Sequence, residues 1–191
     1  MWPWEHLAVG YLVYSLLIRG TTGHSPTTGG TLAAVLGTQF PDLVDKPLAW
    51  GTGLLPGGQS LAHSLLFAIP GILTVVLVTT AIDDRRLGVA FGIGYLSHLP
   101  GDVVYPLVLG GELNLSFLLW PVLPSSGRSS TAMFGHVAEL FAEFAATLAS
   151  PNGVVYLLAE ATLILASLTL WLHDGRPGIP FGRLNPRSGS S

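Results

Sequence analysis

Two residues that commonly bind metal ions or transfer protons, His98 and Asp102, lie four positions apart in Leu87–Gly110, a segment that is otherwise almost entirely apolar. A charged side chain at the centre of a membrane helix costs roughly 2.5–3.5 kcal/mol, so such groups are expected to face a partner, a cavity or a metal ion. Residues four apart lie on one face of a helix, so both side chains can reach the same ion. Three more residues of this kind lie beside other apolar segments: His6, Asp42 and His63.

Imidazole nitrogen and carboxylate oxygen are both ligands of Zn²⁺. If the helices converge, four residues would form a complete ligand shell: Asp42, His63, His98 and Asp102. His6 would join the same ion or a second ion bridged by Asp102. We therefore expect one or two divalent ions, with zinc preferred, although manganese and iron accept the same ligands.

A bound metal lowers the pKa of water to about 7, so the predicted chemistry is hydrolysis by a metal-activated water. Asp45 follows Asp42 by three positions, and either carboxylate is a candidate general base. Asp45 is equally a candidate for a partner that hydrogen-bonds to a metal ligand and orients it. Ser60 and Ser64 flank His63 and are candidates for orienting its ring.

The same residues also have structural interpretations. His98 and Asp102 could form a hydrogen-bonded pair at a helix interface, and Asp42 after a proline could cap a turn. His6 lies beside tryptophans that could form an aromatic belt. Placement of all five residues in one half of the membrane is what favours a joint metal site over these separate roles.

The composition predicts an integral membrane protein. Of 191 residues, 49% are hydrophobic and 10% are charged, whereas a soluble domain has about 25% charged residues. The formal net charge of −3 offers no basic patch, so no nucleic acid is expected as a partner. The chain has no cysteine, so histidine and carboxylate must hold any metal. We expect one membrane-embedded domain over 1–175, with the metal-site motifs in 1–110, and a flexible tail over 176–191.

The elements expected to position these side chains are helices. Five apolar segments are separated by loops rich in glycine, proline or charge: Trp4–Ile18, Thr31–Phe40, Ser60–Ile82, Leu87–Leu109 and Val154–Leu172. The fold class is therefore all-α, a polytopic bundle of about 4–5 transmembrane helices. The second segment is short even when extended to Leu43, so whether it fully crosses stays open. Thr131–Ser150 has apolar residues at helical spacing and is expected to form an interfacial or re-entrant helix.

The distribution of basic residues orients the bundle. If these segments cross in turn, six arginines fall on the side of the C-terminus, and only Lys46 and Arg128 fall on the other side. The positive-inside rule then predicts a multi-pass plasma membrane protein with its N-terminus outside and its C-terminus in the cytoplasm. In this arrangement His6, Asp42 and His63 lie near the outer surface.

Three stretches carry a family resemblance: Phe40-Pro41-Asp42-Leu43-Val44-Asp45, Ala62-His63-Ser64-Leu65 and Gly94-Tyr95-Leu96-Ser97-His98-Leu99-Pro100-Gly101-Asp102. Together with the opening Trp4-Glu5-His6-Leu7-Ala8-Val9-Gly10, they resemble the YdjM-like group of predicted membrane-bound metal-dependent hydrolases, over roughly residues 1–110. The order of histidines and aspartates is also similar to that of zinc-dependent phospholipase C and zinc-dependent single-strand nucleases.

The second resemblance implies that Asp42, His63, His98 and Asp102 bind one metal, and that His6 and Asp102 approach another. The sequence departs from the soluble enzymes in two ways. Those enzymes use a free N-terminal tryptophan as a ligand, whereas Met1 precedes Trp2 here. Their later His-x-x-x-Glu is replaced by His136-Val-Ala-Glu139, which has a different spacing. One or two metals are therefore expected rather than three.

The leading hypothesis is a membrane-bound metal-dependent hydrolase that attacks an ester or phosphoester, plausibly of a lipid, near the outer leaflet. The first alternative is a non-enzymatic membrane scaffold in which the same residues form a structural metal or polar node. The second alternative, a metal or proton transporter, would need polar groups along a full path, and Glu160 is the only deep candidate in its segment. The oligomeric state is left open.

Overall fold

The computed structural model describes residues 1–125 and 132–179, which form six α-helices and no β-strand within those ranges. The helices are α1 (Pro3–Thr22), α2 (Thr28–Lys46), α3 (Leu65–Ala81), α4 (Arg85–Val108), α5 (Met133–Leu148) and α6 (Pro151–His173). A π-helical turn, η1 (Pro47–Gly51), follows α2 directly, and a 3₁₀ turn, η2 (Ser116–Leu119), lies between α4 and α5. The all-α prediction is confirmed. Most of the predicted tail lies outside the described residues.

Two predicted boundaries were wrong, both beside the candidate site. The second segment was expected to end at Phe40, or at Leu43 when extended, but the helix continues to Lys46 and then into η1. The third helix was expected from Ser60, but α3 begins at Leu65 because the Ser64 side chain caps it by accepting a hydrogen bond from the Leu66 amide. Residues 60–64 instead form a turn that is tied to α2.

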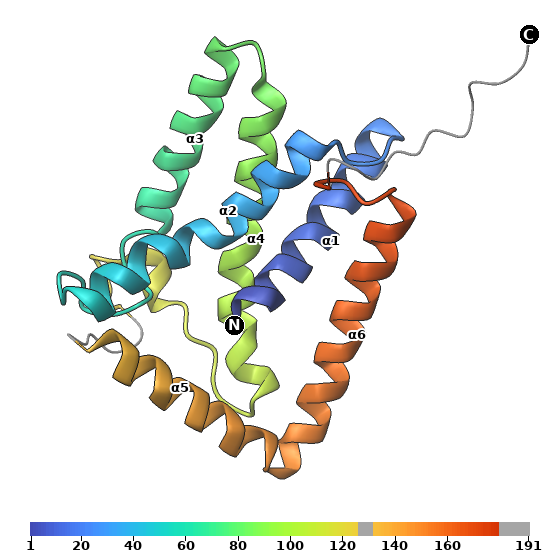
Figure 1. Cartoon of the computed structure of the whole chain (residues 1–191). Coiled ribbons are helices and arrows are strands. Elements are labelled where there is room, and N and C mark those ends of the chain that lie inside the picture. Colours follow the sequence, from blue (N-terminus) through green and yellow to red (C-terminus); the bar gives the residue numbers. More distant parts are fainter. Residues whose placement is uncertain (126–131, 180–191) are drawn as a thin grey trace, which may run out of the picture.

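The centre of the bundle is the contact between α2 and α4, which cross in Figure 1. Their backbones approach so closely that a Cβ at Gly37 would lie 2.1 Å from the Phe91 carbonyl oxygen, and a Cβ at Gly94 would lie 2.1 Å from the Ala34 carbonyl oxygen. Glycine is therefore required at both contacts. Close helix packing through small residues is typical of membrane helices, and here it brings the middle of α2 against the part of α4 that contains Phe91 and Gly94.

Helix α1 joins α6 to the bundle through a buried polar network. The Asp174 carboxylate accepts hydrogen bonds from the hydroxyls of Tyr11 and Ser15, each at 2.6 Å, and forms an ion pair with Arg19. Burial alone would raise the pKa of Asp174, but the hydrogen bonds from Ser15 and Tyr11 and the Arg19 charge hold it below its ordinary value. This network fixes the C-terminal ends of α1 and α6 together.

Much of the outer surface is apolar. Leu73, Leu77 and Val78 on α3 and Leu158 and Leu165 on α6 are all more than half exposed. Apolar surface of this extent marks a contact with a membrane or another protein. Within the described ranges one helix, Asn152–His173, is both long and apolar enough to cross a bilayer by length and composition.

The predicted count of four to five spans is therefore not confirmed by this criterion. The reason lies in the helices themselves. The 17 residues of α3 span about 26 Å at 1.5 Å per residue, slightly less than the hydrocarbon core. Helices α1, α2 and α4 carry charged residues, including the candidate ligands, and these lower their mean hydropathy.

Helix α5 differs from the others because it lies across one end of the bundle, at the bottom of Figure 1. None of its residues is buried, and it contacts α6 and η1. The prediction of a helix over Thr131–Ser150 is thus confirmed for Met133–Leu148, in a position that suits the surface of a membrane.

Candidate metal centre

The five predicted ligands, which are far apart in the sequence, meet at one place in the bundle. His6 comes from α1, Asp42 from α2, His63 from the 60–64 turn, and His98 and Asp102 from α4. Each is at most 8% exposed. Their ligand atoms form two overlapping groups, within each of which all atoms lie within 4.8 Å of one another: His6, His98 and Asp102 in one, and Asp42, His63 and His98 in the other.

Asp45 orients His63. Its carboxylate is fully buried and accepts hydrogen bonds from the backbone amides of Ser60 at 2.8 Å, Ala62 at 2.9 Å and His63 at 3.2 Å. The same carboxylate accepts the Nδ1 proton of His63 at 2.8 Å. A ring that donates from Nδ1 turns its Nε2 toward the cluster, which is how carboxylates commonly fix a metal-binding histidine. Ser60 and Ser64 donate their hydroxyl protons to backbone carbonyls and thereby support the turn rather than the ring.

A backbone carbonyl orients His98 in the same way. Its Nδ1 lies 2.6 Å from the Thr38 carbonyl oxygen on α2. Because a carbonyl can only accept, Nδ1 must carry the proton and Nε2 faces the cluster. The His6 ring stacks on the His98 ring with centroids 3.6 Å apart, which joins α1 to α4 at the cluster.

Asp102 lies at the centre of the three imidazoles. One oxygen, Oδ1, is 3.2 Å from His6 Nε2, and the other, Oδ2, is 3.3 Å from His63 Nε2 and 3.4 Å from His98 Nε2. The Gln59 side-chain amide donates to Oδ2 at 2.8 Å, and the Met1 amino group lies 2.8 Å from Oδ1. Gln59 was missed from the sequence, because a glutamine in a glycine-rich loop shows no helical periodicity.

Asp42 faces the opposite side of the cluster. Its Oδ2 accepts a hydrogen bond from Lys46 Nζ at 2.5 Å, one helical turn further along α2. Its Oδ1 is buried, makes no hydrogen bond in the described part of the chain, and lies 3.5 Å from His63 Nε2. Lys46 was not predicted to belong to the site, although its i,i+4 spacing from Asp42 was a usable signal.

These contacts leave donor atoms that a cation would satisfy. His63 Nε2 and His98 Nε2 are 3.0 Å apart, and both carry lone pairs when each ring is neutral with its proton on Nδ1. Both ring nitrogens of His6 and the Oδ1 of Asp42 are buried without hydrogen bonds among the described residues. Buried polar atoms are normally paired, so unpaired ones require an explanation. The donor set of imidazole nitrogen and carboxylate oxygen fits a divalent cation.

The electrostatics of His63 agree with this fit. Burial alone would lower its pKa, but the neighbouring carboxylates of Asp102, Asp42 and Asp45 raise it to about 10. The surrounding carboxylates therefore favour a positive charge at His63 Nε2. A bound metal cation would supply that charge.

A cavity of about 670 Å³ leads to the cluster. The side chains of Asp42, Asp102, Lys46 and Gln59 line its inner wall, and α5 covers it with His136, Glu139 and Glu143. His136 therefore lies over the site without joining the ligand cluster. Glu160 is elsewhere, on α6, where it accepts a hydrogen bond from the Trp4 indole at 2.6 Å.

The fold and site together define a helical membrane-type protein with a buried cluster of histidine and aspartate side chains that is able to bind a metal. The family profile described as YdjM inner membrane protein matches residues 1–174, and the chain belongs to this family. The match extends well beyond the 1–110 region expected from the motifs and includes both α5 and α6. No curated protein and no solved structure matches the chain.

Proposed function

We propose that this protein is a metal-dependent hydrolase of the inner membrane that cleaves a phosphoester. The observation that carries the proposal is the shared orientation of His63 and His98. Each donates from Nδ1 to a fixed acceptor and aims Nε2 at the place where the Asp42 and Asp102 carboxylates meet. These two histidines and two aspartates would supply four ligands for one divalent ion, with zinc preferred and manganese or iron as alternatives.

His6 allows a second ion. It forms a separate ligand group with Asp102 and His98, and its ring nitrogens make no hydrogen bonds in residues 1–125 or 132–179. Asp102 would be able to hold both ions, because its Oδ1 lies on the His6 side and its Oδ2 on the His63 side. The proposal therefore covers one or two ions.

The cavity favours catalysis over a purely structural metal, because it brings substrate-sized space to Asp42 and Asp102. A divalent ion at this position would activate water and polarise a phosphoryl oxygen. Asp42 is the better candidate for general base, because an ion held by His6, His98 and Asp102 would leave its Oδ1 free, and this oxygen has no hydrogen-bond donor in the described ranges. Asp45 is fully occupied by four donors, and we assign it the orienting role.

Lys46 favours a phosphoester over a neutral ester. It is the single lysine of the chain, and it lies on the cavity wall beside Asp42. An ammonium group at this place would pair with a phosphate oxygen of a bound substrate. A carboxylic ester offers no such charge.

The proposal includes a multi-pass arrangement in the plasma membrane, with the N-terminus outside and the C-terminus in the cytoplasm. The C-terminal ends of α1 and α6 and the hairpin between α3 and α4 lie at the end of the bundle opposite α5 (Figure 1). Arg19, Arg85, Arg86 and Arg176 all belong to that end, which suits the cytoplasmic surface. The cavity and α5 then lie at the outer leaflet.

Metal analysis tests the first step. The purified full-length protein is expected to hold at least one equivalent of zinc, and His63→Ala and Asp102→Ala are expected to hold little. His24→Ala is the matched control, because His24 is exposed and lies in the turn after α1. Equal, sub-stoichiometric metal in all four proteins would refute the metal site.

Turnover tests the second step. The metal-loaded protein is assayed with bis(4-nitrophenyl) phosphate and with phospholipid vesicles, and the control is the same protein after chelation. A scaffold with a structural metal would lose thermal stability on chelation but would release no product from either substrate. That result would overturn the hydrolase proposal and leave the metal site standing.

A further inference from the structure

A second cavity, of about 590 Å³, lies along the bundle between α1, α4 and α6. Helix α1 forms its floor with Glu5, Val9, Val13 and Leu17, which recur every four residues and so share one face. The distance from Glu5 to Leu17 is about 18 Å along the helix. Helix α1 packs against both α4 and α6, and these two helices form the side walls.

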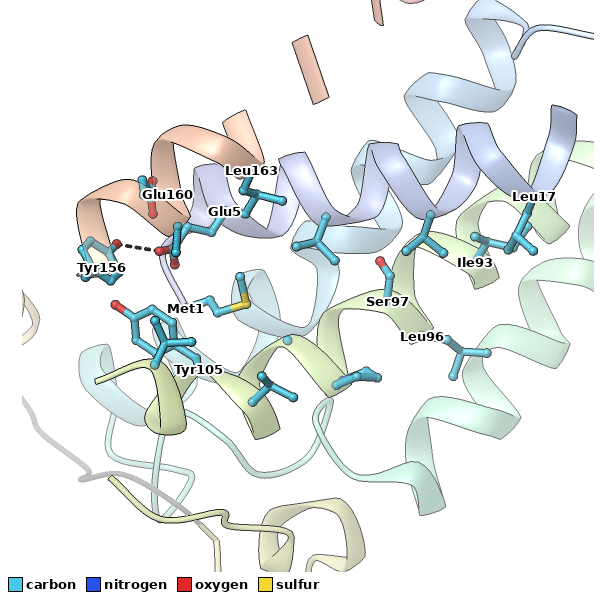
Figure 2. Close-up of a pocket in the computed structure, with 17 residues that line it drawn as sticks. Met1, Glu5, Leu17, Ile93, Leu96, Ser97, Tyr105, Tyr156, Glu160 and Leu163 are labelled. Atoms are coloured by element: carbon cyan, nitrogen blue, oxygen red, sulfur yellow. Dashed lines mark hydrogen bonds between the residues drawn. The ribbon is translucent and has the colours of Figure 1, made fainter. Parts of the chain in front are cut away.

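The two ends of this groove differ in chemistry, as Figure 2 shows. Glu5, Tyr105, Tyr156 and Glu160 gather at one end, whereas Leu17, Ile93 and Leu96 line the other. Glu5 is buried and accepts the Tyr156 hydroxyl proton at 2.5 Å. In the apolar part the one polar side chain is Ser97, which donates to the Gly94 carbonyl and leaves the wall without a free donor.

The polar end adjoins the candidate metal centre. Met1 and Tyr105 line both the groove and the cavity that contains Asp42 and Asp102. Gly101, another lining residue, lies against His6: a Cβ at this position would be 3.5 Å from His6 Nδ1. A molecule that occupies both spaces would therefore run from Asp102, past Met1 and Tyr105, into the apolar part.

The groove opens toward the apolar surface of the protein. Leu17, Leu96 and Val104 line it and are 46%, 45% and 50% exposed. In a protein of the inner membrane family, this opening faces bilayer hydrocarbon. An apolar groove at that depth is filled by lipid chains rather than water, because water there would find no hydrogen-bond partners.

We propose that the groove binds one acyl chain of a membrane phospholipid whose phosphate occupies the cavity beside Lys46 and Asp102. This inference rests on the proposed phosphoesterase function and names its substrate class. The chemistry is divided between the two spaces: the cationic Lys46 and the metal ligands take the phosphodiester, and the apolar stripe of α1 from Val9 to Leu17, about 12 Å long, takes the chain. The substrate thus remains partly in the bilayer while its headgroup ester is cleaved.

Photocrosslinking tests the groove separately from catalysis. The full-length protein is reconstituted in phosphatidylethanolamine–phosphatidylglycerol vesicles that contain a phospholipid with a diazirine near the middle of one acyl chain. Crosslinked residues are then mapped by mass spectrometry. Crosslinks are expected to concentrate on the α1, α4 and α6 residues that line the groove, above the level on the exposed face of α3.

Two substitutions block the groove from different walls, Val13→Trp on α1 and Ala159→Phe on α6. Each is expected to remove the groove crosslinks while the protein retains its zinc. The matched control is Leu165→Trp, because Leu165 is 61% exposed on α6 and lies outside the groove. In turnover assays the blocked variants should lose activity on long-chain phospholipid but keep activity on bis(4-nitrophenyl) phosphate.

Uniform crosslinking of the groove and of α3, or unchanged crosslinking in both blocked variants, would overturn the proposal. A dimer in detergent that both blocked variants convert to a monomer would also overturn it, because a second copy would then occupy the groove. If the groove crosslinks appear and no substrate of either kind is cleaved, the phosphoesterase proposal fails and the lipid site stands. If bis(4-nitrophenyl) phosphate is cleaved and no groove crosslinks appear, the lipid site fails and the phosphoesterase proposal stands.

Discussion

Asp45→Asn tests whether the ligand His63 is held in place by Asp45. The substitution keeps the shape of the side chain but replaces one carboxylate oxygen with an NH₂ group. In the structure Oδ2 accepts from the Ser60 amide, the His63 amide and the His63 ring, whereas Oδ1 accepts from the Ala62 amide. The best orientation of the amide keeps its oxygen at the Oδ2 position, so the NH₂ group must face the Ala62 N–H.

The expected magnitude follows from this geometry. Two donors that face each other in a fully buried site leave their hydrogen bonds unmade, which lowers the free energy of unfolding by about 1–3 kcal/mol. The hydrogen bond to the His63 ring also loses its ionic character, and loss of such an orienting partner lowers metal affinity about 10–100-fold. We therefore expect the metal-free variant to melt roughly 2–12 °C lower, at about 2–4 °C per kcal/mol for a chain of this size.

Two assays measure these effects separately. Thermal unfolding of the metal-free protein in detergent reports the loss of hydrogen bonds, and competition with a chromophoric chelator reports the zinc dissociation constant. Asp83→Asn is the matched control, because Asp83 is exposed in the turn before α4, where its positive φ of 59° is one that asparagine also tolerates. If Asp45→Asn binds zinc as tightly as the unmodified protein, the assignment of Asp45 as the orienting residue is refuted.

Three further predictions concern packing, pH and substrate charge. Gly94→Ala is expected to lower the free energy of unfolding by at least about 1–3 kcal/mol, because its Cβ would meet the Ala34 carbonyl; denaturant unfolding measures this loss. Gly71→Ala is the control, because the space around Gly71 is open, and it should be neutral or stabilising. Asp174 has a lowered pKa in the folded state, so its contribution is complete above the ordinary carboxyl pKa and disappears as pH falls below about 4. Asp174→Asn should therefore lower the melting temperature at pH 7 and flatten its acid dependence, and an unchanged acid profile would contradict this. Lys46→Met is expected to raise KM for a phosphodiester while zinc content stays the same, and Lys46→Arg should restore most of the affinity; equal KM values in all three proteins would count against a phosphate contact.

The sequence was sufficient to predict which residues meet, for reasons that can be stated. Histidine and aspartate are too costly in apolar segments to face lipid, and His98 and Asp102 share a helix face by their spacing alone. The assumption that the segments cross the membrane in turn placed His6, Asp42 and His63 on a common side, and in the structure these residues do converge. The positive-inside rule predicted the orientation in the membrane, which stays a prediction.

The roles within the site could not be predicted, because they depend on atoms that carry no sequence signal. Asp42 and Asp45 are three residues apart on α2, and no pattern distinguishes a ligand from an orienting partner. The turn at 60–64 makes the distinction, since the backbone amides of Ser60, Ala62 and His63 donate to Asp45. The partner of His98 is the backbone carbonyl of Thr38, which any residue would supply.

The conflict between hydropathy and the predicted number of spans has the same origin as the site. Helices α1, α2 and α4 contribute His6, Asp42, His98 and Asp102, and these polar residues reduce the apolar character by which spans are recognised. Their cost in a membrane is offset only if they satisfy one another, and His6 Nδ1 and Asp42 Oδ1 make no hydrogen bond in the described ranges. A cation at the centre would complete that compensation, bind three of these helices and the 60–64 turn together, and so allow segments of modest hydropathy to remain in the bilayer. On this argument the metal contributes to stability as well as to the proposed chemistry, and chelation should loosen α1 and α2 from α4 before it affects the Arg19–Asp174 network.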